Sequence, residues 1–207
     1  MSAARPLSTP PDPDTIDHFV YLNVGWSDYE KLLAMRGDRS VPRITYLDGV
    51  VELMSPSRYH EVDKKCLARL LEAWSETAGV QLEGYGSWTL KSRRQKRGVE
   101  ADECYTVGRV ARDDRDRPDI AIEVVWTAGG IDKLDVYRKL GVREVWFYER
   151  GSLRFFALRR AKANEGYVEI QQSEIVPQLP RELLLACMRE PDQKAALRAL
   201  RAGLRPA

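Results

Sequence analysis

The spacing of apolar residues in the first part of the chain predicts a helix, a hairpin and a second helix. Residues 26–35 have the pattern of a short helix that ends at Gly37. Two strand-like runs then flank Asp48-Gly49, a dipeptide typical of tight hairpins because both central turn residues need positive φ. Residues 59–79 predict a longer helix that ends at Gly79. Its expected inner stripe consists of Val62, Cys66, Leu67, Leu70, Leu71 and Trp74.

The rest of the chain predicts mostly strands, with one internal helix and a helical end. Residues 80–92 and 101–108 are expected to form two strands joined by a basic stretch. The run "DIAIEVVW" lacks polar alternation, which favours a central strand covered on both faces. A helix within 129–141, a strand, a hairpin about Gly151 and a further strand within 166–175 follow, with one or two helices from Arg181. This order predicts the α/β (α+β mixed) class, a mixed sheet with helices.

Length and composition indicate one main domain. The 207 residues are 43% hydrophobic and 31% charged, ordinary values for a globular protein. The proline-rich residues 1–15 are expected to form a flexible N-terminal tail, 16–185 the domain, and 186–207 a C-terminal helical extension. The formal net charge of +2 provides no overall basic field, so any site for a polyanion has to be a local patch.

Cysteine usage and hydropathy point to a cytoplasmic protein. The three cysteines lie far apart and form no C-x-x-C pair, which argues against a disulfide framework and a cysteine zinc site. No apolar run is long enough to span a membrane. The N-terminus has no apolar segment of the kind found in secretory signals.

A few charged residues stand where charge is costly. Glu123 lies inside an apolar strand, and a buried carboxylate needs an ion partner or a metal. Asp102 begins the preceding strand, so neighbouring strands can bring these two acids together, as Mg²⁺ requires. Glu52 shares a strand face with apolar residues and is a third candidate acid. Lys133 follows Gly129-Gly130 and opens the next helix, where it can approach a metal-bound water or a phosphate.

The basic stretch is the candidate nucleic-acid contact. Within seven positions it carries Lys91, Arg93, Arg94, Lys96 and Arg97. These residues suit the phosphate backbone of DNA. The alternative is a solvated loop whose charge is offset by nearby acids.

Each candidate also has a purely structural interpretation. Glu123 can pair with a buried arginine or lysine, and Asp102 can be a strand-start residue. Lys133 can be a surface lysine, and Glu52 one half of a cross-strand ion pair. His60 is either a metal ligand or proton carrier, or a residue that caps or packs at a helix start.

Four segments together resemble a known family. They read "YLDGVVELMSPSRYHE", "GVEADECYTVG", "RPDIAIEVVW" and "DKLDVYRKLGVREVWFY". From about residue 17 to about residue 185 the chain resembles the Uma-type putative restriction endonuclease family of the PD-(D/E)XK nuclease superfamily. The resemblance implies a restriction-endonuclease-like core, a mixed central sheet flanked by helices, here with an additional N-terminal hairpin. It also implies Mg²⁺-dependent cleavage of DNA, with Mn²⁺ as a substitute.

The resemblance also assigns roles to residues. Asp102 matches the aspartate of the family pattern, Glu123 its second acid, and Glu52 an acid before the "MSP"-like motif; these three imply a metal site. The literal Pro118-Asp119 does not match, because Asp119 lies on the same strand as Glu123. The usual lysine position is occupied by Val125, so Lys133 from the following helix takes that role. The loop "WTAGG" departs from the serine-rich form common in the family, which leaves the placement of Lys133 open.

The expected function is therefore a metal-dependent endodeoxyribonuclease. One alternative is a catalytically inactive nucleic-acid-binding or regulatory protein, favoured by Val125. Another is a partner-binding protein in which the acids are ion-paired, favoured if Asp102 and Glu123 point apart or bind arginines. The absence of a G-x-G-x-x-G motif and of a P-loop argues against a nucleotide enzyme. The resemblance also makes a homodimer plausible, with the apolar strand edge around "EVWFY" or the hairpin "LRFFAL" as the expected interface.

Overall fold

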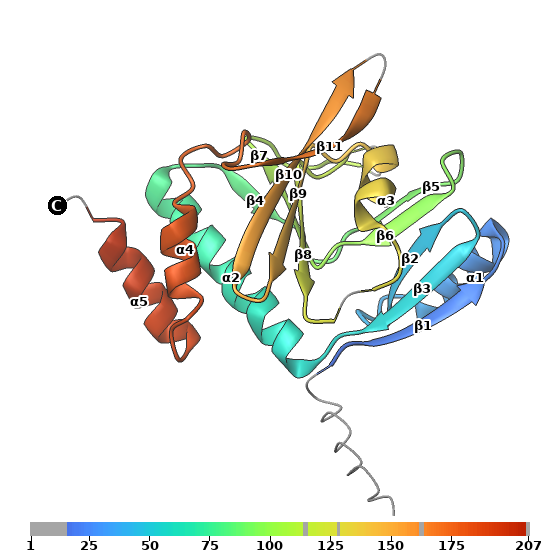
Figure 1. The fold of residues 1–207 in the computed structure, drawn as a ribbon, viewed down its shortest axis with the longest axis horizontal. Coiled ribbons are helices and arrows are strands. Elements are labelled where there is room, and N and C mark those ends of the chain that lie inside the picture. Colours follow the sequence, from blue (N-terminus) through green and yellow to red (C-terminus); the bar gives the residue numbers. More distant parts are fainter. Residues whose placement is uncertain (1–15, 114–115, 128, 162–163, 206–207) are drawn as a thin grey trace, which may run out of the picture.

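The predicted fold class is confirmed by a computed structural model that describes residues 16–113, 116–127, 129–161 and 164–205. The expected tail, residues 1–15, lies outside the described residues. The described chain is a mixed α/β structure with two β-sheets and five helices (Figure 1).

The first sheet is antiparallel and is built from the N-terminal half of the chain. Its strand order is β1-β3-β2-β6-β5. The strands are β1 (His18–Asn23), β2 (Arg43–Leu47), β3 (Val50–Ser55), β5 (Thr89–Ser92) and β6 (Arg97–Glu100). The predicted hairpin is present, because β2 pairs with β3 and both Asp48 and Gly49 have positive φ. The predicted first helix is α1 (Trp26–Arg36), whose Tyr29 packs against Ile44 and Tyr46 of this sheet.

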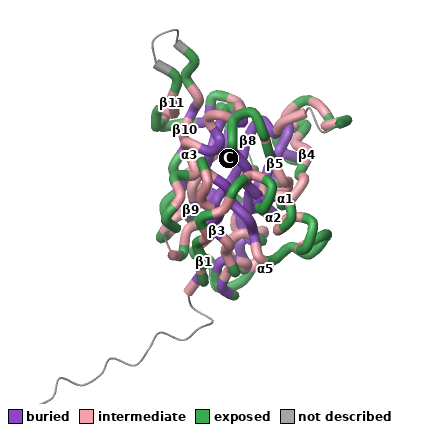
Figure 2. Tube along the Cα trace, turned by 90° about the vertical axis from the view of Figure 1, so that its right-hand side faces the viewer, coloured by how far each residue is buried: buried purple, intermediate pink, exposed green. Residues whose placement is uncertain are grey.

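The second sheet carries the predicted central strand. Its order is β11-β10-β9-β8-β7-β4. The strands are β4 (Leu82–Gly84), β7 (Glu103–Val107), β8 (Ile120–Val125), β9 (Glu144–Glu149), β10 (Ser152–Ala161) and β11 (Asn164–Ile170). β8 and β9 are parallel and connected through α3 (Lys133–Leu140), as a parallel pair requires, and the other pairs are antiparallel. Figure 2 shows β8 among the buried segments.

Helices cover both faces of this second sheet, so β8 is buried on both sides. One face packs on α2 (Arg58–Ala78), α4 (Arg181–Cys187) and α5 (Gln193–Gly203), which lie side by side in Figure 1. The other face packs on α3 through Val136, Tyr137 and Leu140. Because even and odd residues of a strand point to opposite faces, Ile122 faces α2 and Glu123 faces α3.

Several expectations need correction. The expected inner stripe of α2 is buried except for Val62, which is 47% exposed. Val62 lies near the start of α2, and the residues of this helix that pack in the core begin at Cys66. The boundary expected at 185/186 falls inside α4, and Leu184, Leu185 and Leu200 belong to the main core.

None of the described helices is both long and apolar enough to cross a membrane.

The two strands expected within 80–108 are four. The first of them is divided into β4 and β5, which belong to different sheets. The division falls at Gly86, whose positive φ of 58° turns the chain from one sheet toward the other. The basic stretch is the turn of the β5–β6 hairpin.

The two segments expected at a dimer interface, the strand edge around "EVWFY" and the hairpin "LRFFAL", have no open strand edge. "EVWFY" lies in β9, which is paired with β8 and with β10. "LRFFAL" lies in β10, which is paired with β9 and with β11. Their backbone groups are already used in the sheet, so neither strand can pair with a second copy at an edge.

Candidate active site

Asp102 and Glu123 come from adjacent strands. Asp102 immediately precedes β7, and Glu123 lies in the carboxyl half of β8. Glu103 pairs with Ile122 in the antiparallel ladder, so the next position sets Asp102 beside Glu123. The Val124 amide donates a hydrogen bond of 2.6 Å to Asp102 Oδ2. Both carboxylates are buried, with 2% of Asp102 and 5% of Glu123 exposed.

The Asp102 carboxylate is ion-paired within the protein. Arg43 of β2, itself 4% exposed, contacts Asp102 Oδ1 through Nη1. His60 Nε2 lies 3.1 Å from Asp102 Oδ2 and 3.0 Å from Arg43 Nη1. Arg43 also reaches Glu61 with its second terminal nitrogen, at 2.8 Å. Both oxygens of Asp102 therefore have a protein partner, which satisfies the requirement of a buried carboxylate.

His60 connects Asp102 to the start of the chain's first strand. Its Nδ1 lies 3.3 Å from Asp17 Oδ2, and both side chains are fully buried. Asp17 also accepts hydrogen bonds from the Ser57 amide, at 2.7 Å, and the Thr127 amide, at 3.3 Å. Burial alone raises the pKa of Asp17, but the hydrogen bonds from His60 and Ser57 outweigh it and lower that pKa. Asp17 thus ties β1, the start of α2 and the loop after β8 together.

Arg43 and Asp17 were not among the candidates from the sequence. Nothing in their immediate sequence marks them, because their partners lie far along the chain. For His60, the sequence left packing and function open, and its position between two aspartates is a contact that only the fold creates.

Glu123 is held from α3. The Tyr137 hydroxyl donates a hydrogen bond to Glu123 Oε1. Burial, followed by the charge of Glu123, raises the pKa of Tyr137 well above its usual value, so this hydroxyl stays a proton donor. Lys133 Nζ lies 3.5 Å from Glu123 Oε2. The lysine at the start of α3 therefore lies beside Glu123; the approach to a metal-bound water or a phosphate that the sequence suggested stays a prediction.

Glu52 is held by the loop that leads into α3. The amides of Gly130 and Ile131 donate to Glu52 Oε2 at 3.0 and 3.3 Å. A Cβ at Gly129 would lie 2.6 Å from the same oxygen, so a residue without a side chain is needed there. Burial, followed by the charge of Glu52, raises the pKa of the neighbouring Tyr21. Gly129 thus lets the loop approach the carboxylate closely, whereas a Cβ at Gly130 would lie 3.2 Å from the Tyr21 ring.

Glu52, Glu123 and Lys133 surround one small cavity of about 60 Å³. It lies between the two sheets and the start of α3. The described residues that line it are Phe19, Glu52, Met54, Glu123, Val124, Val125, Thr127, Gly129, Ile131, Lys133 and Phe147. Asp102 is not part of this lining; it stands behind Val124, whose amide it binds.

The donor set of this cavity fits a hard divalent cation. Among the described residues, no group of three or more His, Cys, Asp or Glu side chains is arranged to hold a metal. Mg²⁺, however, is usually held by only one or two carboxylates together with water and substrate phosphate. Glu52 and Glu123 both line the cavity, and each carboxylate oxygen has two lone pairs, so both retain capacity to bind a cation. Asp102 can join them only in competition with Arg43.

The basic candidates separate into two kinds. Lys91, Arg93, Arg94 and Lys96 are exposed on and beside the turn between β5 and β6. Arg97 is 7% exposed and forms ion pairs with Asp48, at 2.6 Å, and Asp135, at 2.8 Å. A phosphate contact from Arg97 is therefore not favoured, because its charge is already used inside the protein.

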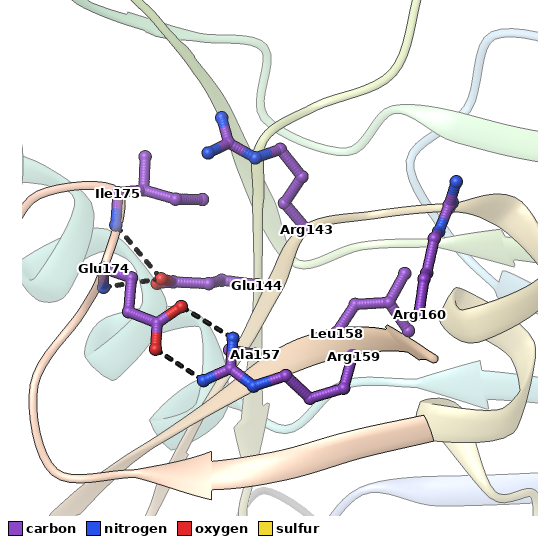
Figure 3. A pocket seen from close by; sticks show the side chains of 9 residues that line it. Arg143, Glu144, Ala157, Leu158, Arg159, Arg160, Glu174 and Ile175 are labelled. Atoms are coloured by element: carbon purple, nitrogen blue, oxygen red, sulfur yellow. Dashed lines mark hydrogen bonds and ion pairs between the residues drawn. The ribbon is translucent and has the colours of Figure 1, made fainter. Parts of the chain in front are cut away.

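Other acids, some of them at a larger hollow, form hydrogen bonds and ion pairs within the protein. A hollow of about 390 Å³ lies at the opposite end of β9 from the site, and Figure 3 shows side chains that line it. Arg159 there is paired with Glu174, and Glu144 accepts hydrogen bonds from the amides of Glu174 and Ile175. Asp119, the aspartate of the literal "PD" pair, immediately precedes β8, and its carboxylate accepts a hydrogen bond from the Val107 amide.

Comparison with known proteins places the chain in a family. The model of the Uma2 family, described as "Putative restriction endonuclease", matches residues 26–190. The chain therefore belongs to the Uma2 family of restriction-endonuclease-related proteins.

A solved structure with similarity to the chain is that of a putative nuclease belonging to DUF820 from Anabaena variabilis ATCC 29413. It is 12% identical, with a TM-score of 0.44, and the match covers 83% of this chain and 98% of the other. Among curated proteins no match was found.

Proposed function

We propose that this protein is a metal-dependent endonuclease that hydrolyses phosphodiester bonds of DNA. The observation that carries the proposal is the cavity in which Glu52, Glu123 and Lys133 meet, within a chain of the Uma2 family. Two carboxylates and a lysine around one hollow are the groups that phosphodiester hydrolysis uses.

The proposed cation is Mg²⁺, with Mn²⁺ as a substitute. Glu123 and Glu52 would hold it, and Asp102 would be the third ligand by exchanging its Arg43 partner for the ion. When bound, such an ion polarises a phosphoryl oxygen and lowers the pKa of a bound water. The protein's own contribution is to fix the carboxylates: Tyr137 holds Glu123, and the 130–131 amides hold Glu52.

Lys133 is the proposed catalytic cation. Its ammonium carries three donors and lies 3.5 Å from Glu123 Oε2, on the lining of the cavity. From there it can orient the attacking water or stabilise negative charge that develops on the phosphate. This role replaces that of the lysine missing at Val125, whose side chain is apolar.

The exposed turn between β5 and β6 is the proposed DNA contact. Lys91, Arg93, Arg94 and Lys96 contribute four positive charges without burial. Replacing Arg93 and Arg94 together by glutamine is expected to reduce the slope of log K against log salt by about two, because about one counterion is released per phosphate contact. An unchanged slope in a fluorescence-anisotropy titration removes this turn from the DNA interface.

A second candidate is a nucleic-acid-binding or regulatory protein without turnover. The specific observation in its favour is the Arg43–Asp102 ion pair, which occupies the oxygen that a cation would need. Val125 at the usual lysine position points the same way.

Nicking of supercoiled plasmid separates the two candidates. Wild type and Glu123→Ala, purified identically, are incubated with Mg²⁺ or Mn²⁺, and binding is followed by gel shift. Cleavage by wild type alone supports the nuclease. Binding by both proteins without cleavage by either contradicts the nuclease and supports the second candidate.

We also propose a homodimer, although the strands first expected to form its interface lie inside the sheet. Size-exclusion chromatography with light scattering tests it. A single species at the chain mass of 23.7 kDa contradicts the dimer.

A further inference from the structure

A second hollow lies directly beside the candidate active site. It has a volume of about 240 Å³ and is lined by Asp63, Val125, Trp126, Tyr148, Arg150 and Gly151. Val125 also lines the cavity of Glu123 and Lys133, so the two hollows lie on either side of this residue at the carboxyl end of β8. The volume is slightly below the roughly 300 Å³ at which pockets for drug-sized ligands begin, which suits one flat ring system.

One exposed aromatic ring, Trp126, lines this hollow, and a second exposed ring, Tyr59, lies beside Trp126. Trp126 is 42% exposed and Tyr59 is 47% exposed, and their ring centroids are 5.4 Å apart. The other four tryptophans are buried or half-buried. The Trp126 indole nitrogen donates to Asp63 Oδ2 at 3.0 Å, which fixes the orientation of the ring. Exposed aromatic rings that are held in place offer a stacking surface.

Two charged residues line the hollow, Arg150 and Asp63, and the Asp63 carboxylate already accepts a hydrogen bond from the Trp126 indole. Arg150 lines it from the turn between β9 and β10, is exposed, and forms no ion pair with any residue of the described chain. An apolar peptide would leave this arginine without a partner. A nucleotide supplies both a flat base for Trp126 and a phosphate for Arg150.

We propose that this hollow binds an unpaired nucleobase of single-stranded DNA, stacked on Trp126. The strand then continues past Arg150 toward the cavity of Glu123 and Lys133. Bases within a duplex are already stacked on one another, so only an unpaired or flipped base offers its face to the protein. The inference deepens the proposed nuclease function and rests on it, since it names single-stranded DNA, or DNA with an unpaired base, as the substrate class.

Binding without cleavage tests the site. A fluorescently labelled 20-nucleotide oligo(dT) is titrated with the full chain in EDTA, and anisotropy and tryptophan emission are recorded. The variants are Trp126→Ala, which removes the stacking surface, and Trp126→Phe, which keeps a ring; urea unfolding checks that both fold. A duplex of equal length is titrated in parallel.

The expected result is a loss of affinity for oligo(dT) of about 5- to 150-fold in Trp126→Ala, from the free energy of stacking one base. Trp126→Phe stays within about threefold of wild type, the duplex affinity changes little, and oligo(dT) quenches wild-type emission. Equal affinity of wild type and Trp126→Ala for oligo(dT) overturns the inference. So does a change of oligomeric mass in Trp126→Ala without a change in DNA affinity, which makes the surface a contact between copies.

The outcomes are separable from those of the nuclease test. Plasmid cleavage by wild type together with Trp126-independent binding of oligo(dT) overturns the base site and leaves the nuclease. Trp126-dependent binding without cleavage of either the plasmid or oligo(dT) under Mg²⁺ or Mn²⁺ supports the base site and removes the nuclease.

Discussion

Replacing Arg43 by methionine measures the contribution of the Arg43–Asp102 ion pair to stability. The same carboxylate of Asp102 is a proposed ligand of the metal. Methionine keeps most of the aliphatic contact of the arginine, so the change chiefly removes the charge. Asp102 is 2% exposed, and removing one partner of a buried ion pair costs roughly 3–5 kcal/mol. Asp102 keeps the Val124 amide and His60, so we expect about 3 kcal/mol. In a protein of this length, that lowers Tm by about 6–12 °C.

Urea unfolding of wild type, Arg43→Met, Asp102→Asn and the double variant measures the interaction. Because both partners are gone in the double variant, we expect a coupling free energy of about 1–3 kcal/mol between the two sites. A loss below about 1 kcal/mol in Arg43→Met would show that the pair contributes little. Additive effects of the two substitutions would contradict a direct interaction.

The same variant tests whether Arg43 and a cation compete for Asp102. With Arg43 absent, the carboxylate is free to bind an ion, and a ligand of the native state stabilises it by mass action. Mn²⁺ is therefore expected to raise the Tm of Arg43→Met more than that of wild type. Equal shifts in the two proteins would remove Asp102 from the proposed metal ligands.

Two more predictions concern the residues that hold the site. The pKa of Asp17 is lowered by folding, so its contribution to stability is present above the unfolded value of 3.8 and is lost as pH falls through the folded value. The difference in unfolding free energy between wild type and Asp17→Asn, from urea titrations, should thus shrink from pH 7 to pH 3; a constant difference contradicts this. Gly129→Ala should displace Glu52, cost roughly 1.5–3 kcal/mol through its hydrogen bonds and slow plasmid cleavage. Gly25→Ala, whose Cβ meets nothing within 4 Å, is the matched control, and equal effects would refute the close approach.

Local sequence signals predicted the elements on which the candidate acids stand. Asp48-Gly49 specified the first hairpin, and the unbroken apolar run around Glu123 specified a strand covered on both faces. The Gly129-Gly130 loop before Lys133 was a visible signal, and the reason for it is the approach to Glu52. These features are local, so their physical cause lies within a few residues of the pattern.

The contacts that surround the acids were not predictable in the same way. Arg43 and Asp102 lie on different sheets, and Asp17 is separated from His60 by a strand, a helix and a hairpin. Such pairs depend on how the two sheets pack against each other, and the spacing of apolar residues along the chain does not predict that packing. The break between β4 and β5 was also missed, because the positive φ of Gly86 sends a seemingly continuous strand into two sheets.

The central claim is that Glu123 and Glu52 hold a divalent cation in the cavity beside Lys133. Isothermal titration of Mn²⁺ into wild type, Glu123→Gln and Glu149→Gln tests it most directly, since Glu149 on neighbouring β9 is a matched control outside the cavity. Changes in groups that merely support a metal ligand cost about 10–100-fold in affinity, so losing Glu123 itself should cost at least tenfold. The account predicts that loss in Glu123→Gln and none in Glu149→Gln; equal Mn²⁺ affinity in all three proteins would contradict it.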